Sequence, residues 1–377
     1  MSTEAVIPHV ETAAEIEAKV YVAPQWKLVW WKFRKHKLAL ISGVIVILIY
    51  LVALFVEFLA PFPPTQTNSK YLYAPPQKLY LFDDQGKFSP MVNGYISKVD
   101  PVALRRTFEV DPAQRIPVRF FVKGYEYKLF GIFPANVHLF GPVDPTQPMY
   151  LLGADRLGRD LLSRLITGTR ISMSIGLIGV ILSLVLGILL GGISGYYGGT
   201  VDNIIQRVIE FLRSIPSIPL WLGLAAALPP SMPPLQVYFG ITIILSLIGW
   251  TGLARVVRGK ILQLREEDYA LAARGAGASD WRIITRHLLP GFTSHLIVSI
   301  TFNIPGMILS ETALSFIGLG MQPPAVSWGV LLQDAQNLMA VAQQSWLMIP
   351  AIWVIGTVLM FNFVGDGLRD AADPYNR

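Results

Sequence analysis

Long apolar runs alternate with short charged segments along most of this chain. Residues 38–60 are uncharged except for Glu57, and residues 171–197 carry no charged side chain and many glycines. About 20 apolar residues in a helix cross the ~30 Å hydrocarbon core of a bilayer. Each run therefore predicts a membrane-spanning helix, and the glycines of the second run predict close contact with a neighbouring helix.

The stretch 214–254 is also uncharged, and it is about twice as long as the ~20 residues that one span needs. Prolines between 229 and 234 divide it near the middle, which predicts a tight hairpin of two spanning helices. The charged stretch 201–213 before it is expected at the cytoplasmic surface. Apolar runs at 292–310 and 346–364 predict the fifth and sixth spans.

Residues 61–150 have a different character, because they are polar, rich in proline and aromatic residues, and charged with both signs. Residues 118–122 and 125–130 show partial alternation around Lys123 and Gly124, which predicts a β-hairpin with its turn at that pair. We expect a small β-rich insertion on the extracytoplasmic side of the membrane.

Residues 151–377 are expected to form the remaining five-helix core. Just before its first apolar run, the charged segment 153–160 precedes residues 160–169, which we expect to form an amphipathic helix lying on the outer face. The predicted fold class is thus an all-α membrane protein with six transmembrane helices and a small β-rich insertion.

Composition agrees with a membrane protein. Hydrophobic residues make up 53% of the 377 positions and charged residues 15%, whereas soluble domains have about 45–50% and about 25%. The net charge of +6 does not indicate nucleic acid as a partner, because membrane proteins gather Lys and Arg at their cytoplasmic faces. The chain contains no cysteine, which excludes disulfides and thiolate metal sites.

The distribution of Lys and Arg predicts the topology. Residues 1–37 are interpreted as a cytoplasmic tail followed by an interfacial helix of indoles and basic groups from residue 26 onward. The basic cluster immediately before the first span places the N-terminus in the cytoplasm. Counting spans returns the charged island 255–291 and the C-terminus to the cytoplasm, and the loop 313–345, which has no Lys or Arg, lies outside.

The island has an unusual composition for a surface helix. Residues 270–277 are almost all small, and Gly275 and Gly277 would each cost about 1 kcal/mol relative to alanine within a helix. Small residues let a helix approach another surface closely. We therefore expect this helix to seat in a cleft of a partner protein, the alternative being a plain connecting loop at the lipid headgroups.

The island resembles the EAA loop of bacterial ABC importer permeases through Ala272, Ala273, Gly277, Leu289 and Pro290. Residues 153–160, 311–320 and 365–370 are similar, in the same order, to motifs of the C-type permeases of dipeptide and oligopeptide uptake systems. The long insertion is similar to that of a subset related to microcin C uptake. The acidic residue that opens the family motif is Leu271 here, and His287 stands where isoleucine is usual, so no family ion pair is carried over.

The resemblance implies the fold of a type I ABC importer permease in the bacterial inner membrane, with both termini cytoplasmic. Its implied partners are a second homologous permease, two ATP-binding subunits and an extracytoplasmic solute-binding protein. Oligopeptides are the implied substrate, with oligosaccharides, opines or nickel chelates as alternatives. The implied coupling residues, which would seat on the ATP-binding subunit, are Tyr269, Ala270, Leu271, Ala272, Ala273, Arg274, Gly275, Gly277, Leu289 and Pro290.

No catalytic chemistry is predicted in this chain. A P-loop is missing, since Gly259-Lys260 is followed by Ile261. The five histidines lack metal-ligand spacing. We therefore expect no catalytic residue, metal site or cofactor here, and we expect ATP and Mg²⁺ to be bound by partner subunits.

Two polar residues within the predicted spans are candidates for a pore or outer gate. Asn303, near Pro305 and Gly306, would lie beside a kink in the translocation path, and Glu311 would line its outer mouth. The alternatives are structural packing for Asn303 and a buried hydrogen bond that holds the external loop for Glu311. Two rival classes are an ion-coupled secondary transporter, which would show inverted repeats and midplane ionisable groups, and a receptor or enzyme acting through the insertion.

Overall fold

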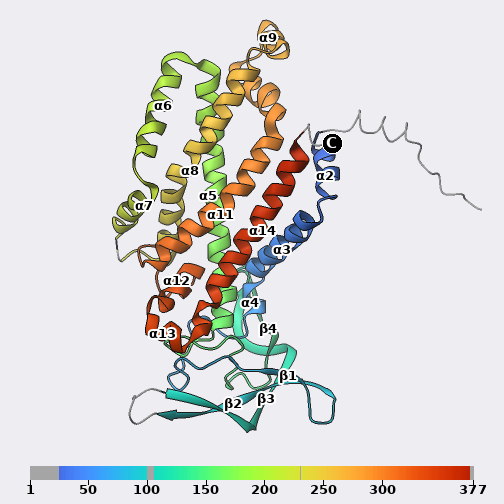
Figure 1. Cartoon of the computed structure of the whole chain (residues 1–377), viewed down its shortest axis with the longest axis vertical. Helices are drawn as coiled ribbons and strands as arrows, with labels where there is room; N and C mark the ends of the chain where they lie inside the picture. Colours follow the sequence, from blue (N-terminus) through green and yellow to red (C-terminus); the bar gives the residue numbers. More distant parts are fainter. Residues whose placement is uncertain (1–24, 100–105, 230, 374–377) are drawn as a thin grey trace, which may run out of the picture.

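The computed structural model describes residues 25–99, 106–229 and 231–373, in which long helices form one body and a small sheet lies at one end (Figure 1). The tail predicted for residues 1–24 lies outside the described residues. Within the described residues, five helical segments are long and apolar enough to cross a membrane: Lys37–Leu54, Leu161–Tyr197, Pro234–Leu264, Asp280–Phe316 and Ser345–Ala372.

These segments carry the labels of Figure 1. The first three are α3 (Lys37–Leu54), α5 (Leu161–Tyr197) and α8 (Pro234–Leu264). The fourth joins α10 (Asp280–Arg282), a π-turn and a 3₁₀ turn to α11 (Thr293–Phe316). The fifth is a 3₁₀ turn followed by α14 (Ile349–Ala372). The interfacial helix is α2 (Gln25–Phe33), which packs against α14.

The hairpin predicted for residues 214–254 is wrong in its first limb. Helix α7 (Ser217–Ala226) has 10 residues, which at 1.5 Å per residue is about half of the ~30 Å core. It is bent by 85° from α6 (Gly199–Ser214), the charged stretch predicted at the surface, and a sixth span exists only if the two count together. The break has a local cause: Ile215 is extended (φ −88°, ψ 127°), as expected of a residue that precedes proline, here Pro216.

Glycines bring α5 and α8 into backbone contact, as the sequence predicted. Gly187, Gly191 and Gly195 occur at four-residue spacing and face α8. A Cβ atom added to Gly191 would lie 2.9 Å from Cα of Ala254, closer than real Cβ contacts. Removing the side chains at this face lets the two helices pack closely enough for dispersion contacts along the backbones.

The insertion is an antiparallel meander in the order β1-β2-β3-β4. Its strands are β1 (Leu79–Phe82), β2 (Phe88–Val99), β3 (Arg106–Leu129) and β4 (Phe133–Pro142). Val92 of β2 and Ile116 of β3 are fully buried against Phe62 and Met149, which flank the sheet in sequence. The β-rich insertion is therefore present, and it has its own small core.

The predicted turn at Lys123 and Gly124 is wrong, because both residues lie inside β3. Gly124 is explained by a close contact instead: a Cβ atom there would lie 2.6 Å from Cδ2 of His138 on β4. The turn comes later, at Gly131, which has φ +75°. A glycine in a strand indicates a bulge or a close approach, and Gly124 has both, since the register of β3 against β4 also shifts between Lys123 and Tyr127.

The separate amphipathic helix predicted for residues 160–169 is also wrong. Helix α5 is continuous for 37 residues, about 55 Å at 1.5 Å per residue, so it extends well beyond a ~30 Å core. Asp160 caps its first turn, with Oδ2 accepting hydrogen bonds from the backbone N (2.7 Å) and Oγ (2.6 Å) of Ser163. The charged segment therefore starts the span and does not lie beside it.

Candidate functional site

The island between α8 and α11 folds into a short helix, α9 (Asp268–Gly275), at the end of the molecule opposite the sheet (Figure 1). Ala270 is buried against a cluster that includes Ile261 of α8 and Ile283 of the π-turn, and Ala273 is half-buried there. The exposed residues of α9 are Asp268, Tyr269, Leu271, Ala272, Arg274 and Gly275. The helix therefore rests on the bundle through alanines and presents its other residues outward.

The two glycines of the island have different roles. Gly277 has φ +78°, and the backbone N of Ala278 after it donates to the carbonyl of Ala273 (3.1 Å), which is how a left-handed glycine ends a helix. Gly275 lies within the helix, and a Cβ atom there would meet no other atom within 4 Å. Because nothing in the described chain requires Gly275, its missing side chain leaves a bare backbone surface open to a partner.

Polar contacts tie the island to the end of α5. Arg265 donates from Nη1 to the carbonyl oxygens of Gly195 and Tyr196, both at 3.0 Å, and a cation is favourable at the C-terminal end of a helix. The hydroxyls of Tyr196 and Tyr197 donate to the two carboxylate oxygens of Asp280, at 2.8 and 3.0 Å. The guanidinium of Arg274 lies 5.3 Å from the centre of the Tyr196 ring. Movement of α9 is therefore linked to α5 on both sides of the island.

A second set of contacts continues to α6. Arg258 of α8 pairs with Asp202 at the start of α6 through two hydrogen bonds of 2.5 Å. Ser194 of α5 donates to the same carboxylate (2.5 Å) and accepts from Nε2 of Gln206 (3.1 Å). Three helices thus meet at one carboxylate beneath α9. Sequence reasoning missed both sets of contacts, since they join distant residues; the pair Tyr196-Tyr197 at the end of an apolar run is a local sign of the first set alone.

Leu289 and Pro290, for which the family resemblance implied a coupling role, lie in the 3₁₀ turn that leads into α11. Leu289 is half-buried in the cluster under α9, and Pro290 is exposed. The preceding segment, Ile283–Leu288, is a π-turn. Proline lacks a backbone N–H and its ring displaces the carbonyl of residue i−4, so a local irregularity in the hydrogen-bond ladder is expected at this position.

Asn303 belongs to one exposed face of α11. Small and polar residues recur on this face at spacings of three and four: His295, Ser299, Asn303, Gly306, Ser310 and Ala313. The neighbouring positions Ile304 and Ile308 are buried in the core, and a Cβ atom on Gly306 would meet nothing within 4 Å. Polar groups within a span rarely face lipid. This face, called the α11 polar face below, therefore suits a water-filled path or a second protein.

Glu311 makes the buried hydrogen bonds to the external-loop region that were the alternative to a place at the outer mouth. It is fully buried, and its carboxylate accepts from Oγ of Ser172 on α5 (3.0 Å) and Oγ of Ser315 (2.8 Å). The same two hydroxyls accept from the backbone N of Trp328 (3.1 Å) and of Met321 (2.9 Å) in the external loop. Glu311 thus joins two spans to the loop, and in this conformation it does not line an outer mouth.

Charged residues also hold the outer end together. Asp155 and Arg164 are each 1% exposed and form an ion pair, and Nε of Arg159 donates to Asp155 at 2.7 Å. Asp334 of the external loop pairs with Nε of Arg156 (3.1 Å). Burial, followed by the charge of Asp155, raises the pKa of the Asp334 carboxyl. This cluster connects the segment before α5 to the external loop, and its buried ion pairs indicate a structural role.

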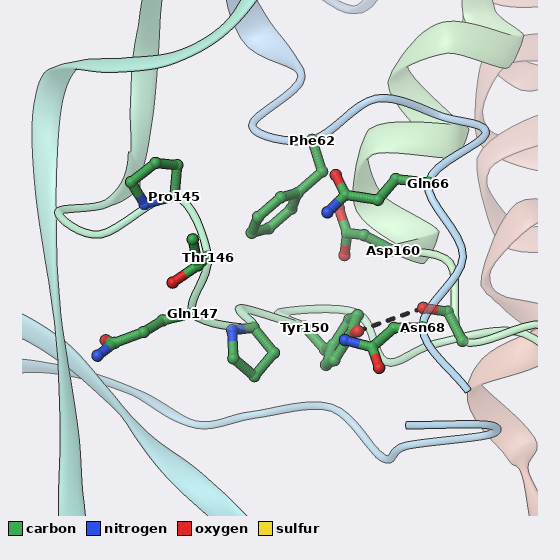
Figure 2. Close-up of a pocket in the computed structure, with 10 residues that line it drawn as sticks. Phe62, Gln66, Asn68, Pro145, Thr146, Gln147, Tyr150 and Asp160 are labelled. Atoms are coloured by element: carbon green, nitrogen blue, oxygen red, sulfur yellow. Dashed lines mark hydrogen bonds between the residues drawn. The ribbon is translucent and has the colours of Figure 1, made fainter. Parts of the chain in front are cut away.

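Figure 2 shows a cavity beside this cluster, with Phe62, Asn68, Tyr150 and Asp160 among its lining residues. Its volume is about 20 Å³, room for about one water molecule, so it is no solute site. The hydroxyl of Tyr150 donates to the carbonyl of Gly158 at 3.2 Å. Burial raises the pKa of Asp160 to about 6, and its Oδ1 has no hydrogen-bond partner among the described residues.

Comparison with known proteins shows the family. The family model described as "Binding-protein-dependent transport system inner membrane component" matches residues 183–377. This chain belongs to that family. The model described as the N-terminal TM domain of oligopeptide transport permease C matches residues 24–76. The permease family predicted from the island motif is thereby confirmed, and the chain is a membrane permease subunit of an ABC importer and not an enzyme.

Similar curated proteins are permeases as well. The dipeptide transport system permease protein of Lactococcus lactis is 34% identical, over 92% of this chain and 89% of that protein. The oligopeptide permease of Haemophilus influenzae is 40% identical, over 62% and 73%. The glutathione permease of Pectobacterium atrosepticum is 39% identical, over 59% and 72%. An inward-facing MetNI methionine ABC transporter chain aligns with a TM-score of 0.42 and 17% identity, over 55% of this chain and 96% of that one.

Proposed function

We propose that this permease forms one half of the translocation path of an ATP-driven importer of oligopeptides or peptide-like compounds in the bacterial inner membrane. A second homologous permease completes the path, two ATP-binding subunits bind ATP and Mg²⁺, and an extracytoplasmic solute-binding protein delivers the solute. The choice of peptides is supported by relatives named for dipeptides, oligopeptides and glutathione.

The observation that carries the proposal is the geometry of α9. Its exposed face contains Leu271 and the open backbone of Gly275, while its other face is linked to the bundle through alanines. Seated on an ATP-binding subunit, α9 would pass the movement of that subunit to α5 through Arg265 and Asp280. With leucine in place of the family's acidic residue, docking rests on shape and apolar contact.

The topology follows from the same placement. Figure 1 shows α9, α2 and the C-terminal end of α14 at one end of the molecule and the sheet at the other. With α9 in the cytoplasm, both termini are cytoplasmic and the insertion is outside. The basic residues at 27–37, which lie at the α9 end, support this orientation.

The α11 polar face is proposed to line the path between the two permeases. Asn303 and Gly306 are exposed in the middle of the span, where lipid is a poor environment for an amide. A path between helices must let polar solutes pass without binding them strongly. Small side chains on this face would leave the path wide enough for a solute. Alternating access then arises because the ATP-binding subunits contact α9 differently in their ATP-bound and free states.

The test is a Gly275→Leu variant, purified with its partner subunits and reconstituted in proteoliposomes. We expect the variant permease to fold but to retain little bound ATP-binding subunit. ATP-driven peptide uptake should fall at least about tenfold, since a loss of ~1.4 kcal/mol in docking free energy weakens binding by a factor of ten. Gly356→Leu on α14 is the control, because Gly356 is also helical with open space around it, and it should leave subunit association unchanged.

Normal uptake by Gly275→Leu would contradict docking through α9. Uptake without ATP, by a purified complex that lacks a P-loop subunit, would instead support an ion-coupled secondary transporter. If oligosaccharides or opines compete for uptake and peptides do not, the protein would still be an importer subunit, but its substrate class would not be peptides. Solute turnover without transport would point to the receptor or enzyme alternative.

A further inference from the structure

The turn between β3 and β4 presents an apolar surface that no described part of the chain covers. Residues 129–135 contain no charged or polar side chain. Around Gly131, the side chains of Phe130, Ile132 and Phe133 are 45%, 71% and 61% exposed. Contiguous exposed apolar surface of this kind indicates a binding surface on a folded protein. These residues are called the hairpin tip below.

The hairpin tip lies beside a membrane span. The ring of Phe130 is 5.5 Å from the ring of Phe55, the residue that ends α3. Phe130 also lines an open apolar cavity of about 420 Å³ together with Tyr50 and Leu54 of α3 and Leu177 of α5. Since a helix rises 1.5 Å per residue, Tyr50 lies about 8 Å along the helix from Phe55, so the cavity that Phe130 lines is at the outer end of α3.

A second aromatic residue of the same hairpin, Phe121, also lies against the outer end of the first span. Phe121 is 68% exposed, and its ring lies 6.2 Å from that of Phe58 in α4 (Val56–Leu59). Phe121 and Phe130 both have positive φ, +53° and +54°, a conformation that bulky side chains rarely adopt. The backbone thus takes this conformation once inside β3 and once in the turn just after it, and each time an aromatic ring lies against the outer end of the first span.

The base of the hairpin is fixed, so the tip has a defined position. The His138 ring of β4 lies 4.4 Å from the Tyr125 ring of β3. Arg170 of α5 pairs with Glu57 of α4 and donates from Nε to the carbonyl of Ala53 at 2.9 Å. Helix α4 contacts both β3 and β4. The sheet therefore cannot carry the tip away from the membrane without breaking these contacts.

The surroundings of the hairpin tip match a lipid surface. On α3, Ile47, Leu48 and Leu51 are exposed, and this lipid-facing surface continues through the cavity to Phe130. Lys128 is exposed at the start of the tip and Glu126 is exposed two residues before it, where charged groups would lie at the headgroups. An apolar tip with charges only at its base is the pattern of an interfacial anchor.

We propose that the hairpin tip is inserted into the outer leaflet of the membrane that α3 crosses, with phospholipid acyl chains around Ile132 and Phe133. The insertion is then anchored at two points, by its covalent link to α3 and by the tip. Such an anchor fixes the orientation of the sheet on the membrane, so that a soluble partner meets the sheet in one orientation. This inference does not depend on the nature of the solute.

The test uses the absence of cysteine from the chain. Ile132→Cys is labelled with an environment-sensitive fluorophore in the complete complex, reconstituted in phosphatidylethanolamine and phosphatidylglycerol nanodiscs with or without spin-labelled phosphatidylcholine. Gln85→Cys is the matched control, since Gln85 is exposed in the polar β1–β2 turn of the same insertion. Phe133→Cys provides a second tip position if Ile132→Cys assembles poorly.

We expect a blue-shifted emission at position 132 that spin-labelled lipid quenches and aqueous iodide does not. Position 85 should show the reverse pattern. Equal iodide quenching at both positions would overturn the proposal, because the tip would then be in water. Protection of position 132 from both quenchers would also overturn it, because a protein and not lipid would then cover the tip.

Discussion

Arg258 and Asp202 form a two-point ion pair in which Nε donates to Oδ1 and Nη2 donates to Oδ2, each over 2.5 Å. The pair joins α8 to the first turn of α6, where a carboxylate is favourable for the helix dipole. Two parallel hydrogen bonds fix the direction as well as the distance between the helices. The pair is therefore suited to transmit movement of α8 to α6 and on to the bent helix α7.

Replacing Asp202 by asparagine should lower the free energy of unfolding by about 1–2 kcal/mol, because charge-assisted hydrogen bonds to a partly buried group are lost. Thermal unfolding in detergent measures this change, and ATP-driven uptake should fall further than stability does. The control is Arg207→Gln on the same helix, whose pair with Glu210 is mostly exposed. Equal effects of the two variants would contradict a special role for the Asp202 pair.

Gly191→Ala should destabilise the permease by about 1–3 kcal/mol, the usual cost of overpacking. The added Cβ would lie 2.9 Å from the Cα of Ala254, and backbone atoms cannot move aside as a side-chain end can. Gly223→Ala on α7 is the comparison, since a Cβ there meets nothing within 4 Å. If both substitutions leave the unfolding temperature unchanged, the close contact between α5 and α8 is wrong.

Asp160 should make stability depend on pH. Burial raises its pKa to about 6, above its value of about 4 in the unfolded chain, so its contribution is fully present below pH ~4 and is lost as pH rises through ~6. A difference of about two pKa units corresponds to roughly 2–3 kcal/mol.

Asp160→Asn keeps a good helix cap and cannot ionise, which makes it the matched variant. Between pH 4.5 and 7.5, the unfolding temperature of the native permease should fall relative to that of the variant. Other titrating groups, including Asp334, cancel in this comparison. A constant difference between the two proteins across this pH range would show that Asp160 does not titrate there.

Gly306→Leu tests the α11 polar face. A Cβ atom added at Gly306 would meet no atom within 4 Å, so the isolated permease should keep its unfolding temperature. Uptake by the complete complex should fall at least tenfold because the path is narrowed. Gly356→Leu on α14 should leave uptake unchanged. Cross-linking of position 306 to the second permease, with unimpaired uptake, would assign this face to an interface and remove it from the path.

Local patterns predicted the features that depend on a few consecutive residues. Apolar runs identified α3, α5, α8, α11 and α14, because crossing a bilayer requires length and hydrophobicity that the sequence states directly. The small residues 270–277 predicted the short helix α9, because their composition is also a local property. The bend before Pro216 was within reach of sequence reasoning too, since proline restricts the residue before it, but the uncharged run around it was interpreted as one straight limb.

Contacts between distant residues were not predictable in this way. Gly124 was interpreted as a turn, and only the position of His138 on the next strand shows that it is a close approach. Asp280 lies far along the chain from Tyr196 and Tyr197, and no periodicity connects them. Glu311 had two open interpretations until its burial against Ser172 was known.

The sequence by itself determined that this chain crosses a membrane and which family it belongs to, because span length, charge bias and motif residues are all local properties. The tertiary structure alone decided which glycines are contacts, that Glu311 is buried, that Arg258 reaches Asp202, and that the hairpin tip lies against α3. These relationships depend on how elements pack against one another, and packing is set by the shape of the whole fold and not by any one segment.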